Sequence, residues 1–225
     1  IALVQQLLDR GADPSLTGND GLAAYHYVLS AAVSTPRYAQ QKSAQLYTLL
    51  KPESLSLQVD GRLIKLDNRQ MAMFLVLLMQ ALFHTHLGGA LVFSEAFSAA
   101  RLAECVAHLP EALLPGRRKR RSYISSQLSQ HEVNSKHPYG KKLFLRLNHG
   151  QYILNPGLKI RQGERWCAVY ALQSPEDLGH DLQTYLQDMS PELVKILGGK
   201  KDVYKYSEEA VGYWAEMIRR AAQKT

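Results

Sequence analysis

Five consecutive basic residues give this sequence its clearest capacity for chemistry: Arg117, Arg118, Lys119, Arg120 and Arg121. A guanidinium group offers a planar fork of donors that fits phosphate oxygens and the O6 and N7 atoms of guanine. Residues 117–161 hold eleven Lys and Arg against one acid, so eleven minus one leaves +10 in a chain of net charge +7. This concentration predicts a surface that binds a phosphate backbone. The simpler alternative is a solvated charge run in a loop.

The residues after the basic run mix apolar and short polar side chains at helical spacing. A helix is expected over about 119–133, with Leu128 and either Tyr123 or Ile124 facing the core. His131 is a further candidate for this inner face. Serine is a poor helix former, so the density of serines on the outer face indicates a task other than helix stability.

This basic segment contains the candidate contacts to DNA. Arg121, Gln127 and Gln130 are expected to read bases, because Arg pairs with guanine and Gln with adenine. The serines are short enough to let the helix approach phosphates, and the other basic residues would hold the backbone. Asn148 and His149 are either wing-tip contacts or ordinary turn residues. The full candidate set is Arg117, Arg118, Lys119, Arg120, Arg121, Ser122, Ser125, Ser126, Gln127, Gln130, Lys141, Lys142, Arg146, Asn148 and His149.

Further elements must position these side chains. Residues 55–66 alternate apolar and polar around Asp60-Gly61, which predicts a hairpin with a tight turn. A long helix over about 68–84 is apolar on several faces and is expected to be buried. Ser98 can cap a second helix, and residues 143–156 predict another hairpin.

This order of elements resembles the OmpR-type winged-helix DNA-binding domain of bacterial response regulators over residues 55–156. The Val-Asp-Gly-Arg turn at 59–62 and the hairpin end at 150–154 are local matches, although Gln151 separates the family's adjacent Gly-Tyr pair. The resemblance implies a basic helix in the major groove and a wing that reaches the minor groove or the backbone. It also implies a transcriptional regulator that binds double-stranded DNA sequence-specifically.

The N-terminal segment resembles part of an ankyrin repeat. Val4–Pro14 ends a helix in a leucine pair and a Gly-Ala-Asp turn, and Asn19–His26 leads into the next helix. Only His26 matches the family's Thr-Pro-Leu-His tetrad, and in the family that residue stabilises the turn by hydrogen bonding. The resemblance implies a docking surface for a protein partner. Either further repeats precede Ile1, or these helices pack on the next domain. Helices are expected over 21–33 and 38–50, with a break at Thr35-Pro36.

The last part of the chain is expected to be mostly helical after a short strand over 165–172. Ser-Pro pairs at residues 174 and 190 are typical helix starts. A final helix over about 202–223 carries an apolar stripe that suits core packing or a homodimer. A dimer would fit a protein that reads two half-sites.

Several classes of function are not expected. We find no two-histidine-plus-carboxylate spacing, phosphate loop or nucleophile elbow, so we expect no enzyme, no metal and no cofactor. The longest apolar stretch, 71–78, is too short to span a bilayer. Cys105 and Cys167 are too few for a disulfide framework, which favours the cytoplasm and, for a DNA binder, the nucleoid.

The main alternative is a protein-interaction adaptor, or a secreted effector, that uses its ankyrin and winged-helix surfaces to bind protein. Residues 116–121 would also fit a nuclear-import signal, so an effector could enter a host nucleus. Composition does not separate these alternatives.

The expected fold class is α+β, mainly α with small β-hairpins. Three parts are predicted: an ankyrin-type helical segment at 1–53, a winged-helix domain at 54–157 and a mostly helical extension at 158–225.

Overall fold

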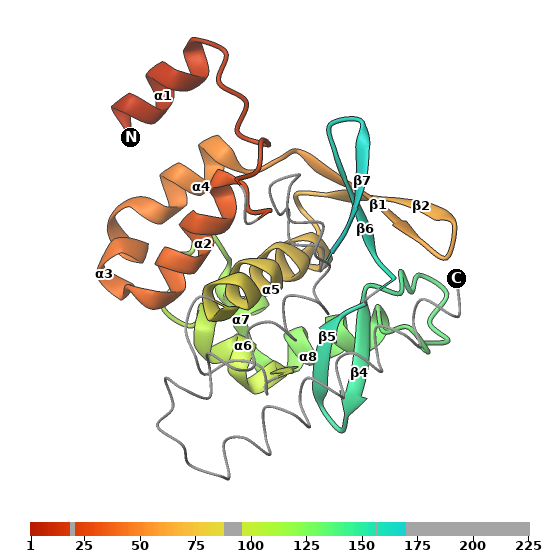
Figure 1. The fold of residues 1–225 in the computed structure, drawn as a ribbon. Helices are drawn as coiled ribbons and strands as arrows, with labels where there is room; N and C mark the ends of the chain where they lie inside the picture. Colours follow the sequence, from red (N-terminus) through yellow and green to blue (C-terminus); the bar gives the residue numbers. More distant parts are fainter. Residues whose placement is uncertain (19–20, 88–95, 156, 170–225) are drawn as a thin grey trace, which may run out of the picture.

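The computed structural model describes residues 1–18, 21–87, 96–155 and 157–169 (Figure 1). Its helices are α1 (Ala2–Asp9), α2 (Ala24–Ser34), α3 (Pro36–Tyr38), the π-helical turn η1 (Ala39–Ser43), α4 (Ala44–Leu50), α5 (Met71–Leu87), α6 (Ala99–Val106), α7 (Gly116–Lys119) and α8 (Arg121–Gln130). Its strands are β1 (Ser54–Val59), β2 (Arg62–Asp67), β3 (Phe97–Ser98), β4 (Phe144–Asn148), β5 (Gln151–Leu154), β6 (Lys159–Gln162) and β7 (Arg165–Ala168). The described residues therefore form a mixed α and β fold, which confirms the expected class in its coarse form.

Helix α5 is the centre of the core, as its apolar sequence predicts. Residues 71–82 are buried without exception. In Figure 1, α5 lies between the N-terminal helices and the layer that contains α6 and α8. Helix α2 packs directly against α5, so one apolar cluster continues from the N-terminal segment into the rest of the fold.

The N-terminal helices follow the signals in the sequence. Helix α2 ends at Ser34, and Pro36 begins α3, where its missing N–H leaves no helical hydrogen bond unmade. Both expected helices, over 21–33 and 38–50, are present, although the second is interrupted by η1. Because α2 packs on α5, these helices use the following part of the chain to bury their apolar side.

The first sheet has the strand order β2-β1-β6-β7. Its β1–β2 hairpin confirms the predicted turn: Asp60 and Gly61 have positive φ of 48° and 72°, as a two-residue hairpin turn requires. Strand β1 also pairs with β6, with Leu57 opposite Ile160. The predicted boundary at residue 157 therefore lies between strands of one sheet. Strand β6 was not predicted, whereas β7 agrees with the start of the strand expected over 165–172.

The second sheet has the order β3-β5-β4 and is antiparallel throughout. The predicted hairpin over 143–156 is confirmed as β4 and β5, whereas β3 was not predicted because it is only two residues long. Ser98 caps α6 as expected, since its Oγ accepts from the main-chain N of Arg101 at 3.0 Å. The final helix over 202–223 and its stripe for a homodimer lie outside the described residues.

Candidate nucleic-acid interface

Two leucine-sized side chains fix the rotation of α8. Ile124 and Leu128 are fully buried, and their spacing of four residues places both on one side of the helix. Ser122, Ser125 and Ser126 are exposed. The polar residues of α8 therefore lie on the side away from the core, as the serine pattern predicts.

The predicted third helix is shorter than expected and is preceded by a break. Arg120 has extended backbone angles, φ −64° and ψ 132°, so α7 ends at Lys119 and α8 begins at Arg121. At the other end α8 stops at Gln130 rather than near Val133. The prediction of one helix over 119–133 is wrong, because a run of Arg and Lys carries helix propensity but no signal for the interruption.

Four arginines surround this break. Arg117, Arg120 and Arg121 are exposed and Arg118 is half-buried. Their side chains make no hydrogen bond or ion pair with any other described residue. Charged groups of one sign without internal partners are available to a phosphate backbone.

Lys119 has an internal role instead. Its Nζ donates to the main-chain carbonyl of Leu109 and lies 3.8 Å from Oε1 of Glu111. The second oxygen of Glu111 accepts from the main-chain N of Gly116 at 2.9 Å. Lys119 therefore fastens α7 to the loop after α6 and does not belong with the four arginines.

Lys141 and Lys142 also contact the protein itself. Lys141 Nζ donates to Oε1 of Gln70 at 2.6 Å, and burial lowers the pKa of Lys141 below its usual range. Lys142 Nζ lies 2.8 Å from Oδ2 of Asp60. Lys141 thus holds the segment ahead of β4 to the residue before α5, and Lys142 holds it to the β1–β2 turn. Their positions in the sequence do not reveal these contacts.

The β4–β5 hairpin presents a third kind of basic residue. Arg146 is exposed, and it donates through Nη2 and Nε to the Tyr152 hydroxyl at 2.6 and 3.1 Å. Tyr152 is buried. His149 is exposed in the turn beside Gly150, whose φ of 73° closes the hairpin. The structure describes the backbone of Asn148 as the end of β4.

Main-chain hydrogen bonds join the end of α8 to the start of β4. The N–H of Val133 donates to the carbonyl of Phe144 at 2.8 Å, and the N–H of Leu143 donates to the carbonyl of His131 at 2.7 Å. Figure 1 shows α8 beside the β4–β5 hairpin. The structure thus places the start of β4 beside the C-terminal end of α8, whereas the arginines lie at its N-terminal end.

The only acid in the basic segment points inward. Glu132 is buried, and its Oε1 accepts from Nδ2 of Asn134 at 3.2 Å. No carboxylate between residues 117 and 155 of the described chain is therefore exposed beside α8.

Two exposed tyrosines were missed by the sequence analysis. Tyr123 is 36% exposed on α8, where the sequence left open whether it or Ile124 faces the core. Tyr139 is 75% exposed in the loop that follows, with its ring 5.9 Å from the ring of His137. The four-residue spacing of Ile124 and Leu128 would have placed Tyr123 outside, because successive residues lie about 100° apart around a helix and position 123 is off the side that this pair shares.

The described residues also bear on two other features, metal sites and membrane-spanning helices. These residues contain no group of three or more His, Cys, Asp and Glu side chains arranged to hold a metal ion. Within the same ranges, no helix has both the length and the apolar character needed to cross a membrane.

Comparison with protein-family models, with curated proteins and with solved structures finds no match.

Proposed function

We propose that the chain binds double-stranded DNA, with α8 in the major groove and the β4–β5 hairpin as a wing. The order of α5, α6, α8, β4 and β5 supports this proposal, because it is the order of the winged helix that the sequence resembles. The pairing of β3 with β5 supports it further, since it fastens the hairpin beside the helices.

The observation that carries the proposal is the set of arginines next to the polar side of α8. Arg117, Arg120 and Arg121 are exposed and have no acidic partner among the described residues. Buried Ile124 and Leu128 hold the helix so that its serines and glutamines lie toward solvent or at its flanks. This arrangement suits a helix that enters a groove between two phosphate backbones.

The roles within this surface can be divided by position. Arg117, Arg118 and Arg120 would contact phosphates, because they lie before the first residue of α8. Arg121 and Gln130 would read bases from the two ends of the helix, and Gln127 from its flank. Lys119, Lys141 and Lys142 are left out of the surface because of their internal contacts.

Titration of a duplex DNA at several salt concentrations tests the proposal. Phosphate contacts from Arg117, Arg118 and Arg120 predict that the logarithm of the binding constant falls with the logarithm of salt concentration with a slope of about −3, from roughly −0.9 per phosphate contact. Absence of salt-dependent binding at low ionic strength would contradict DNA binding. Selection from a pool of random duplexes then tests sequence specificity, and hence the role as a transcriptional regulator, because a specific reader enriches a shared motif.

A protein-interaction adaptor is the second candidate, and one observation favours it. Leu3, Leu7 and Leu16 expose 67%, 49% and 71% of their surface, and α1 has no buried residue. Exposed apolar side chains on one short segment suit a protein partner. Proximity labelling with the wild type and with Leu3→Ser/Leu7→Ser tests this candidate, since a partner of α1 would be lost in the variant and retained in Arg120→Ala/Arg121→Ala.

A further inference from the structure

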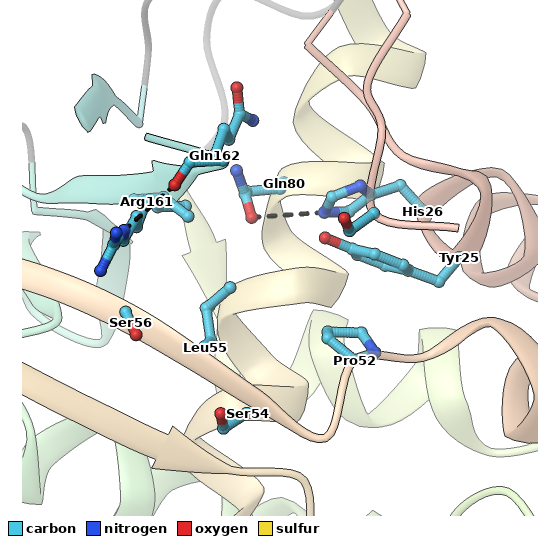
Figure 2. Close-up of a pocket in the computed structure, with 12 residues that line it drawn as sticks. Tyr25, His26, Pro52, Ser54, Leu55, Ser56, Gln80, Arg161 and Gln162 are labelled. Atoms are coloured by element: carbon cyan, nitrogen blue, oxygen red, sulfur yellow. Dashed lines mark hydrogen bonds between the residues drawn. The ribbon is translucent and has the colours of Figure 1, made fainter. Parts of the chain in front are cut away.

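A polar cavity lies where α2, α5, β1 and the β6–β7 turn meet, and its lining includes no residue of α7 or α8 (Figure 2). Its volume is about 210 Å³. Tyr25 and His26 enter it from α2, Gln80 from α5, and Ser54 and Ser56 from β1. With Arg161 and Gln162 from β6, side chains from four separate elements converge on one space.

Gln80 is an unusual residue for its position. It is the one polar side chain in the buried run 71–82 of α5 and is only 6% exposed. Its Oε1 lies 3.3 Å from Nε2 of His26, whereas its amide nitrogen has no hydrogen-bond partner within the described residues. An amide in the middle of an apolar helix is costly to bury unless its donors are used.

His26 determines which end of the Gln80 amide remains unused. Nδ1 of His26 accepts from the main-chain N–H of Ala23 at 3.0 Å. The ring proton must then reside on Nε2, which donates to Oε1 of Gln80. The hydrogen bond between Ala23 and His26 matches the turn-stabilising role expected for this histidine. The carbonyl oxygen of Gln80 is occupied by its contact with His26. The two N–H donors of Gln80 are the groups left for another molecule.

Tyr25 adds a second unused group. Its side chain is 7% exposed, its ring centroid lies 4.3 Å from that of His26, and Figure 2 shows its hydroxyl directed toward Gln80. The hydroxyl makes no hydrogen bond to any other described residue. Burial raises the pKa of Tyr25 to about 12, so the hydroxyl stays protonated and can donate. Two donors without a partner among the described residues thus line one cavity.

The charge of the lining restricts the ligand. No Asp, Glu or Lys lines the cavity, so an ammonium group would find no counter-ion there. Arg161 is the one charged residue of the lining, and its guanidinium already contacts the Gly163 carbonyl at 3.0 Å and the Glu164 carboxylate at 3.3 Å. An anion would therefore enter a nearly uncharged space at a high desolvation cost.

The apolar part of the lining and the volume of the cavity further restrict which ligand can bind. Pro52, Leu55 and Ile160 form apolar walls, and the Tyr25 ring offers a flat surface. The volume is below the roughly 300–1,000 Å³ of sites for drug-sized ligands, so only a small molecule fits.

We propose that this cavity binds a small neutral molecule that has a flat apolar body and a carbonyl or hydroxyl oxygen. The oxygen accepts hydrogen bonds from the Gln80 amide and the Tyr25 hydroxyl, and the apolar body lies between the Tyr25 ring and Leu55. This site does not depend on the proposed DNA binding, because none of its lining residues belongs to α7, α8 or the β4–β5 hairpin.

Three probes of similar shape and different charge test the proposal: benzamide, sodium benzoate and benzylamine. Binding to the full chain is measured by saturation-transfer NMR over millimolar concentrations. Benzamide is expected to bind, and the two charged probes are expected to bind at least about tenfold more weakly, because their charge is not balanced in the cavity. Equal or tighter binding of benzoate or benzylamine would overturn the neutral class of ligand.

Variants locate the probe. Tyr25→Phe removes only the hydroxyl, and Gln80→Met removes the amide at nearly constant volume; each is expected to raise the dissociation constant of benzamide about tenfold, the loss of one hydrogen bond. Tyr27→Phe is the matched control, since Tyr27 is 51% exposed on the same helix and does not line the cavity. Thermal melts establish that each variant is folded.

Two results would overturn the site itself. One is the absence of benzamide binding to the wild type, which would mean that the cavity holds only water. The other is unchanged binding in folded Tyr25→Phe. Arg120→Ala/Arg121→Ala is expected to bind benzamide normally, so failure of this proposal is distinguishable from failure of DNA binding.

Discussion

Lys142 and Asp60 form an ion pair, with 2.8 Å between Nζ and Oδ2, that joins the β1–β2 turn to the residues ahead of β4. Both residues have a left-handed backbone, with φ of 53° and 48°. The ion pair thus links two residues of positive φ, one in the turn of the first sheet and one ahead of β4 in the second sheet. The contact also removes one positive charge from the surface that could hold DNA.

Substitutions at Asp60 separate the ion pair from the turn. Asp60→Asn tolerates the left-handed backbone and loses only the charge, so the free energy of unfolding should fall by about 0.2–1 kcal/mol. Asp60→Ala should lose about 1 kcal/mol more, because alanine is disfavoured at positive φ. Urea denaturation measures both values. Equal stability of the two variants would show that the backbone conformation at Asp60 costs nothing.

The arginines at α7 and α8 have no internal partner among the described residues, whereas the lysines have internal contacts. Substitutions in the two groups should therefore affect DNA binding unequally. Arg120→Ala/Arg121→Ala should weaken binding, and it should reduce the salt slope by about one unit for the lost phosphate contact of Arg120. Lys142→Ala removes the same kind of charge from a residue that is paired with Asp60, so its slope should stay close to that of the wild type. A comparable reduction in Lys142→Ala would place that lysine on the DNA after all.

Helix α8 should depend on its buried side for stability and on its exposed side for binding. Leu128→Ala deletes a fully buried side chain and should lower the free energy of unfolding by about 2–5 kcal/mol. Ser126→Ala, on the exposed side of the same helix, should change it by less than about 0.5 kcal/mol. Chemical denaturation of both variants checks the assigned rotation of the helix, which a large loss in Ser126→Ala would contradict.

The buried His131 predicts a loss of stability in acid. Burial is the main cause that lowers the pKa of His131 from 6.5 to about 4, followed by the charges of Lys141 and His137. Between pH 6.5 and 4 the unfolded chain binds more protons than the folded chain, so stability is complete above pH 6.5 and falls as the pH drops through this window.

His131→Leu tests this origin of the pH dependence. Nδ1 of His131 is buried without a partner in the described part of the chain, so leucine can replace the ring without breaking a bond to that atom. The variant should lose less stability than the wild type between pH 6.5 and 4, measured by urea denaturation at each pH. His149→Gln, at the exposed hairpin turn, should keep the wild-type profile. A wild-type profile in His131→Leu would assign the pH dependence to other groups.

The sequence predicts the elements whose cause is local. The Asp60-Gly61 turn, the Ser98 cap and the break before Pro36 each depend on a few adjacent residues, and all three are present. The buried α5 follows from its composition alone. In these cases the signal and the structure occupy the same short stretch of chain.

The contacts that revise the candidate site are distant in sequence. Lys141 reaches Gln70 and Lys142 reaches Asp60, and no local pattern announces either partner. A lysine at an internal contact and a lysine at a DNA surface have the same side chain and similar neighbours. Only the fold distinguishes them.

The pairing of β1 with β6 has a consequence for how the protein is made. Leu57 and its partner Ile160 are separated by 103 residues, as 160 minus 57 shows. A ribosome that adds about 5–20 residues per second needs roughly 5–20 s to reach the second strand after the first has been synthesised. During that interval one edge of β1 presents unpaired N–H and C=O groups to other chains. The nascent protein therefore has an uncovered edge at β1 while residues 60–160 are being synthesised, and β6 covers that edge when it is added.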